Sequence, residues 1–147
     1  MTVSRKVLCV SYAAIGLLAA IGTWGNIPGL VSQNGFVGGT IRFWQDVLVN
    51  EASRFIAVDV LFLALAVIVW MVLEARRLRI PGVWFYIVFG LLIAISVAVP
   101  LFMIHREWKL GVADPGSSAG TLRLADLVGI VACGAAFVAF AIYSLMR

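Results

Sequence analysis

Four long apolar runs, three of them free of any charge, set the strongest limit on how this chain can fold. They cover residues 7–24, 55–73, 83–104 and 127–146, and Asp59 is the single charged residue among them. A helix needs about 20 mostly apolar residues to cross the hydrocarbon core of a bilayer. The runs are continuously apolar, without the period of two that is typical of membrane β-barrels. The sequence therefore predicts an all-α membrane protein, a four-helix transmembrane bundle formed by one domain over residues 1–147.

The composition agrees with a membrane protein and excludes a nucleic-acid binder. Hydrophobic residues make up 63% of the chain and charged residues 12%, whereas a soluble domain is about half apolar and about a quarter charged. The net charge of +4 comes from basic residues at the ends of the apolar runs. Such a surplus is typical of membrane-flanking segments. The lipid bilayer is therefore the expected partner, and nucleic acid is not.

Basic residues also predict the orientation. The short link between the second and third runs carries Arg76, Arg77 and Arg79, and the N-terminus carries Arg5 and Lys6. Cytoplasmic segments are enriched in Lys and Arg. With four spans, these segments and the C-terminus share one side, so we expect both termini in the cytoplasm.

A short surface helix is expected in the first outer loop, over residues 41–49. Thr40 can cap its start, and most of its apolar side chains fall on one side of a helical wheel. Such a helix lies in the membrane interface or covers the bundle. Asn50 then caps the second spanning helix.

Small residues and a proline indicate how the third run packs. Gly90, Ala94 and Ala98 recur every four residues, so they share one face of a helix and allow close approach of a neighbour. Pro100 is expected to bend the outer end of this helix.

Asp59 is the first functional candidate, because an ionisable residue within a membrane span is costly and often functional. We expect it to face the bundle interior and to bond Arg106, with Arg123 as the second choice. A bond to water or to a neighbouring helix is the structural alternative. With four spans, a polar cluster would gather at the outer side from Trp44, Asp46, Arg54, Asp59, His105, Arg106, Glu107 and Asp126.

Other residues carry weaker signals. One histidine beside Arg106 and Glu107 makes no zinc site, since such sites need three or four ligands. Asp126 is a plausible first-turn acid of the fourth helix. We expect neither a metal nor a cofactor.

Several stretches of the sequence resemble a family of small bacterial multi-pass membrane proteins of unknown function. The resemblance covers about residues 7–108 and implies a small protein of the bacterial inner membrane, without implying a substrate or catalytic residue. It rests on Asn34-Gly35-Phe36, Phe43-Trp44-Gln45-Asp46, Ala52-Ser53-Arg54-Phe55, Asp59, Glu74-Ala75-Arg76-Arg77, Trp84, Tyr86, Pro100 and Arg106-Glu107.

Two classes of function compete. The first is a non-catalytic module, either an accessory subunit of a larger membrane complex or a binder of a lipid or isoprenoid-like molecule. The second is a small membrane-embedded enzyme that uses Asp59 and an outer-side acid in acid–base chemistry on an apolar substrate. An ion pathway is the weakest hypothesis, because a relay needs several ionisable residues at membrane depth. An enzyme should place Asp59 beside a second titratable group at the mouth of a cavity between helices.

Overall fold

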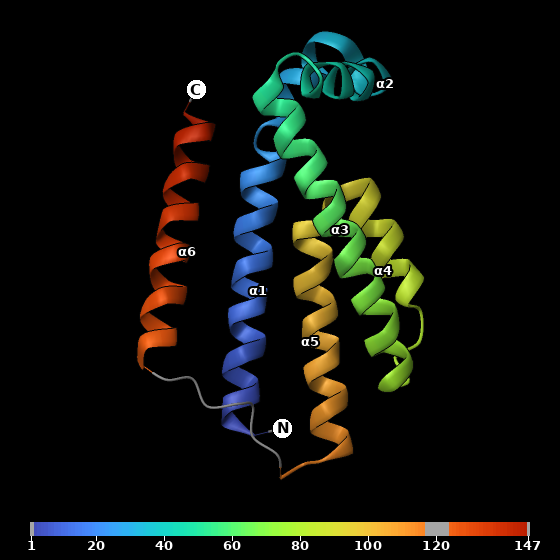
Figure 1. The fold of residues 1–147 in the computed structure, drawn as a ribbon, viewed down its shortest axis with the longest axis vertical. Helices are drawn as coiled ribbons and strands as arrows, with labels where there is room; N and C mark the ends of the chain where they lie inside the picture. Colours follow the sequence, from blue (N-terminus) through green and yellow to red (C-terminus); the bar gives the residue numbers. More distant parts are fainter. Residues whose placement is uncertain (1, 117–123, 147) are drawn as a thin grey trace.

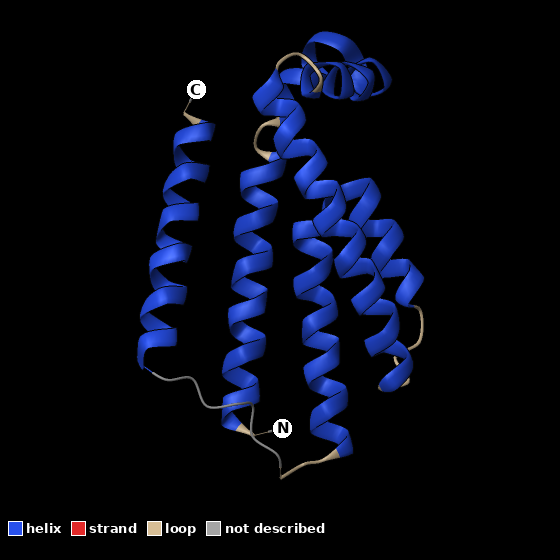
Figure 2. Cartoon of the chain, viewed as in Figure 1, coloured by secondary structure: helices blue, strands red, loops and turns tan. Residues whose placement is uncertain are grey.

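The computed structural model describes residues 2–116 and 124–146, which form helices and no strand (Figure 2). The helices are α1 (Val3–Trp24), α2 (Ile27–Val47), α3 (Glu51–Arg77), α4 (Val83–Phe89), the π-helix η1 (Gly90–Ala94), α5 (Ile95–Ala113) and α6 (Leu124–Leu145). By length and composition, four helical segments could cross a membrane: Val3–Trp24, Glu51–Arg77, Val83–Ala113 and Leu124–Leu145. The prediction of an all-helical membrane protein with four apolar segments is confirmed.

The third segment does not form the single straight span that was predicted over residues 83–104. The backbone of Ala94 is extended (φ −169°, ψ 120°), and the chain reverses there into α5. The Tyr86 hydroxyl lies 3.0 Å from Nδ1 of His105. In one straight helix these residues would stand about 28 Å apart, at 1.5 Å per residue. The segment is therefore a helical hairpin, with α4 and η1 as one arm and α5 as the other (Figure 1).

Small residues explain how the two arms come so close. A Cβ added to Gly90 would lie 3.1 Å from the Cβ of Ala98 across the hairpin. The predicted close approach is thus real, but it joins two arms of one segment. Pro100 was expected at the outer end of a helix, which it would bend, but it does not lie there. It is buried in the first half of α5, where its Cβ lies 3.4 Å from the Cβ position of Gly16 on α1.

The hairpin changes the order of the chain through the bundle. α5 runs antiparallel to α1, and α6 runs parallel to α1, with Ala141 and Leu145 of α6 beside Gly22 and Gly25 (Figure 1). We call the end of the bundle that holds Arg5, Glu74 and Glu107 the basic end, and the opposite end the α2 end. The N-terminus lies at the basic end and the C-terminal end of α6 at the α2 end. This does not agree with the expectation of both termini on one side, because that expectation counted the hairpin as one crossing.

The predicted surface helix is longer than expected. α2 lies across one end of the bundle and begins at Ile27 (Figure 1). Gly35 divides it into two helical arms, with φ 67° and ψ 174°, a conformation that is essentially restricted to glycine. Thr40 does not cap a helix, since its hydroxyl donates to the carbonyl of Phe36 within α2 at 3.0 Å. The Asn50 cap is confirmed: its side chain accepts a hydrogen bond from the Ser53 N–H at 2.8 Å.

The hydrophobic core lies toward the basic end, where the C-terminal half of α3 meets the hairpin. Its buried members are Met71, Ala75, Ile80, Ile87 and Phe102. Phe102 also contacts the rings of Trp70 and Tyr86 edge-on. The core therefore fixes α4 and α5 against α3, and it places the polar residues of these helices side by side.

Candidate functional site

A network of arginines around two buried carboxylates joins α1, α3 and α5 at the basic end. Glu107 accepts hydrogen bonds from Arg5 and from Arg106, each at 2.6 Å. Glu74 accepts from Nε of Arg106 at 2.6 Å and from two nitrogens of Arg77 at 2.7 and 2.6 Å. We call these five residues the basic-end network. Arg106 is its centre, since its guanidinium bonds both carboxylates.

Burial makes this network energetically important. Glu107 is 2% exposed, Arg5 6% and Glu74 8%. Buried charges are tolerated only with close partners and good hydrogen-bond geometry. Each carboxylate here is held by two guanidinium groups, the donors that match a carboxylate best. The network therefore ties three helices together, and loss of either carboxylate removes the bonds that it makes to two arginines.

Aromatic residues line the hairpin beside the network. His105 is half-buried, bonds the Tyr86 hydroxyl through Nδ1, and its ring lies 5.9 Å from that of Trp108. Lys109 places its ammonium 5.6 Å from the centre of the Trp108 ring, within cation–π distance. Among residues 2–116 and 124–146, no group of three or more His, Cys, Asp or Glu side chains could hold a metal ion.

The structure does not bring the eight candidates of the sequence together. Four of them lie at the α2 end or on the adjoining part of α3: Trp44, Asp46, Arg54 and Asp59. The other four lie toward the basic end: His105, Arg106, Glu107 and Asp126. The hairpin is the reason, because it returns α5 to the side from which α4 began. Asp126 stands in the first turn of α6, as expected for an acid at a helix N-terminus.

The prediction that Asp59 faces the bundle interior is wrong. Its side chain is exposed on α3, and within the described part of the chain it makes no hydrogen bond or ion pair. Arg106, its expected partner, is held in the basic-end network at the other end of the bundle. Arg123, the second choice, lies outside the described residues. Asp59 lines an open hollow of about 520 Å³ with Glu51 and Arg54.

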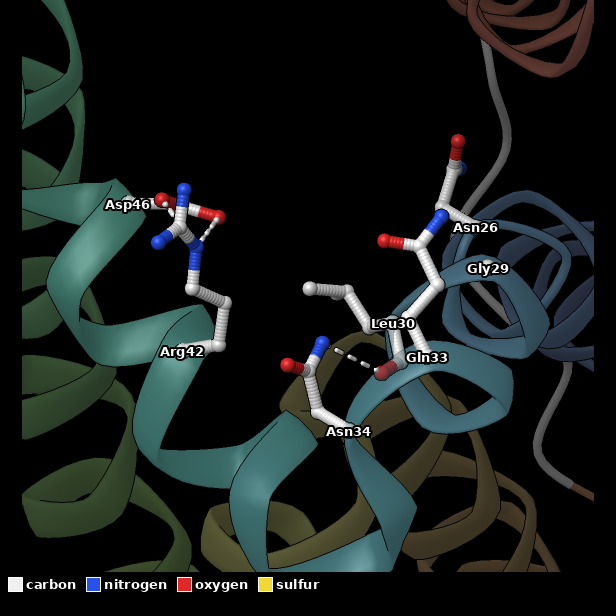
Figure 3. A pocket seen from close by; sticks show the side chains of 7 residues that line it. All are labelled: Asn26, Gly29, Leu30, Gln33, Asn34, Arg42 and Asp46. Carbon is white, nitrogen blue, oxygen red and sulfur yellow. Dashed lines mark hydrogen bonds and ion pairs between the residues drawn. The ribbon is translucent and has the colours of Figure 1, made fainter.

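A second hollow, of about 560 Å³, lies between the two arms of α2. Figure 3 shows amide side chains of one arm opposite Arg42 and Asp46 of the other. Nε of Arg42 bonds Asp46 at 3.0 Å, and both side chains are exposed. Asn34 is engaged with the carbonyl of Leu30 at 3.1 Å. The hollow is polar and open, and its charges are already paired.

Sequence reasoning missed three members of the network, Arg5, Glu74 and Arg77. In the sequence, Glu74 is the single acid close to Arg76, Arg77 and Arg79, and that was the available signal. Oppositely charged residues at the same depth on two helices can be predicted to form an ion pair only when the two helices are known to be neighbours. The hairpin supplies that neighbourhood, and nothing at Ala94 or Ile95 announces a chain reversal, since neither is a glycine or a proline.

Comparison with known proteins gives one match. A family of proteins of unknown function, DUF2834, matches residues 11–108, from α1 to the second half of α5. No curated protein and no solved structure matches the chain. The matched segment contains Glu74, Arg77, Arg106 and Glu107, whereas Arg5 and α6 lie outside it. The chain belongs to the DUF2834 family, whose function is unknown.

Proposed function

We propose that this chain is a non-catalytic membrane module, which acts by binding other membrane helices or a lipid or isoprenoid-like molecule. One observation carries the proposal. The buried carboxylates, Glu74 and Glu107, each accept hydrogen bonds from two arginines. A general acid or base must reach the substrate with a free site for the proton. Carboxylates engaged in this way serve to hold helices together.

The uncovered surface supports the same function. None of the described residues of α6 is buried, and its contacts are chiefly with α1. A Cβ added to Gly129 or Gly134 would meet nothing within 4 Å. Small residues on an open helix face allow another backbone to approach closely. The bundle thus combines a firmly tied end with helix faces that are free to bind.

An acid–base enzyme is the second candidate, and Asp59 is the observation that favours it. The residue is unpaired within the described part of the chain, and Glu51 lines the same hollow. However, all six residues that line this hollow belong to α3. A site that holds an apolar substrate needs a second wall. The hollow therefore fits a contact surface better than an enzyme pocket.

The distribution of basic residues supports an orientation in the inner membrane of a bacterium. Nine basic residues are described, that is eleven less Arg123 and Arg147. Seven lie at the basic end: Arg5, Lys6, Arg76, Arg77, Arg79, Arg106 and Lys109. Only Arg42 and Arg54 lie at the α2 end. By the positive-inside rule the basic end faces the cytoplasm, and the C-terminal end of α6 then faces outward.

Complementation of a deletion strain separates the two functions. Asp59→Asn removes the proton acceptor and keeps hydrogen bonding, so a module that only binds should retain its phenotype. Asp46→Asn is the matched control, the same change at an exposed ion pair on α2. A folded Asp59→Asn variant that assembles like the wild type but fails to complement, beside a working control, would overturn the proposal in favour of the enzyme. If the chain is a binding module, native mass spectrometry of the wild-type protein should find a retained lipid-like molecule or a stoichiometric membrane partner.

A further inference from the structure

Two charged side chains near the start of α3 lack adequate partners. Asp59 has none within the described residues, and Arg54 donates one N–H to the carbonyl of Leu48 at 2.9 Å. A guanidinium has five N–H donors, so most of those on Arg54 remain available. Asp59 stands 18 residues before Arg77, or about 27 Å along the helix at 1.5 Å per residue. With Arg77 at one boundary of a hydrocarbon layer about 30 Å thick, Asp59 falls just inside the other.

These two residues flank an apolar stripe on the free side of α3. The stripe, which we call the α3 face, consists of Phe55, Val58, Phe62, Leu65 and Val69, all exposed. Arg54 and Asp59 line the same hollow as Phe55, Val58 and Phe62. At 100° per residue, the α3 face points about 140° away from the buried side of the helix, with Ala64, Met71 and Ala75. Another helix can therefore lie along it without displacing α4 or α5.

We propose that a second copy of this chain covers the α3 face. In this dimer the two α3 helices pack side by side, and Arg54 of each copy pairs with Asp59 of the other. The proposed dimer joins copies inserted in the same direction, so the two helices are parallel and the two-fold axis runs along the membrane normal. The proposal goes beyond the proposed function, since a module of this kind could act as a monomer.

The spacing of the residues carries the argument. The α3 face follows the a and d positions of a heptad repeat, with Phe55, Phe62 and Val69 at a and Val58 and Leu65 at d. Arg54 then occupies position g, and Asp59 occupies position e of the following heptad. In a parallel two-stranded packing, position g lies beside the next position e of the partner, where opposite charges set partner and orientation. The partner's position e lies five residues after position g, which is the separation of Asp59 from Arg54.

Self-complementarity is what identifies the occupant. The α3 face carries one positive and one negative flank at the required offset, so a single surface satisfies itself twice about a two-fold axis. Pairing also removes the cost of a lone carboxylate facing lipid. Glu51 lies about two turns nearer the helix start than Asp59, where water and the N-terminal dipole stabilise it.

Cysteine cross-linking in native membranes tests the dimer. In a chain with Cys9 and Cys133 changed to alanine, Val58→Cys should give a disulfide-linked homodimer under mild oxidation. Val60→Cys is the matched control, since the two valines are 53% and 45% exposed but lie on opposite sides of α3. No dimer at either position, equal dimer at both, or a Val58→Cys link to a different protein would overturn the proposal.

Charge reversal tests the register. In the Val58→Cys background, Arg54→Asp and Asp59→Arg should each lower the dimerisation constant by about tenfold, for two lost pairs of ordinary interhelical strength. The cross-linked fraction should fall accordingly. The double reversal restores opposite charges at the same offset, so it should restore the dimer. A double reversal that cross-links no better than the single variants would overturn the assignment of the Arg54–Asp59 pair. These readouts do not depend on the phenotype, so they stand or fall separately from the proposed function.

Discussion

The two halves of α3 have similar apolar composition but very different surroundings. In the C-terminal half, Met71 is 1% exposed and Ala75 2%, whereas in the N-terminal half Phe55 is 75% exposed and Phe62 69%. Lipid tails are as apolar as leucine, so hydrophobicity alone does not drive membrane helices together. The packed half is the one that ends in the basic-end network and meets the hairpin. Polar bonds and close backbone approach thus decide which half is covered.

The largest effect is expected from a test of sidedness, which gives an all-or-none result. In a cysteine-free chain, Asp114→Cys and Arg79→Cys should react with a membrane-impermeant reagent from the same side of the membrane. Gln45→Cys on α2 should react only from the other side. A single straight span over residues 83–113 would instead place Asp114 with Gln45. Labelling of Asp114→Cys together with Gln45→Cys would therefore disprove the hairpin.

The apolar runs were enough to predict the helices, because bilayer thickness and backbone hydrogen bonding leave few alternatives. The runs marked only the lipid-facing part of each helix. α3 begins at Glu51 and ends at Arg77, since helical hydrogen bonds continue into the polar region. The Asn50 cap was also predictable, because its bond to Ser53 is local in sequence.

The hairpin and the network could not be predicted from the same pattern. Residues 83–104 have the length of one span, and the reversal at Ala94 is stabilised by contacts distant in sequence, such as Gly90 with Ala98 and Tyr86 with His105. One missed reversal moved Arg106 and Glu107 to the wrong side of the membrane. The predicted polar cluster was wrong for that reason, although Arg106 and Glu107 do contact each other.

The largest effect on stability is expected from Glu107→Leu. The change leaves Arg5 and Arg106 without a shared carboxylate in a buried site, and such losses cost about 3–5 kcal/mol. Asp59→Leu is the matched control in the uncovered half, where no bond within the chain is lost, so its free energy of unfolding in detergent should change little. Unfolding in increasing denaturing detergent measures both. Equal losses for the two variants would contradict the contrast between the halves.

A smaller loss is expected from overpacking the hairpin. Gly90→Val places a branched side chain where even a Cβ would stand 3.1 Å from Ala98, and overpacking of this kind typically costs about 1–3 kcal/mol. Gly134→Val makes the same change on α6, where nothing lies within 4 Å of the added Cβ. The control should therefore unfold like the wild type. If both variants unfold alike, Gly90 is not a close contact of α5.

The smallest effect is expected from Tyr86→Phe, which removes one hydrogen bond between the hairpin arms. A single bond of this kind contributes about 1 kcal/mol. The ring still packs against Phe102, so the core is preserved.

A double-mutant cycle with His105→Ala tests the contact itself. If the two residues share a hydrogen bond, the double variant should lose less stability than the sum of the losses in the two single variants. In a straight helix they would stand about 28 Å apart, and their effects would simply add. Additive losses would therefore argue against the folded-back arrangement that separates the packed half of the bundle from the open one.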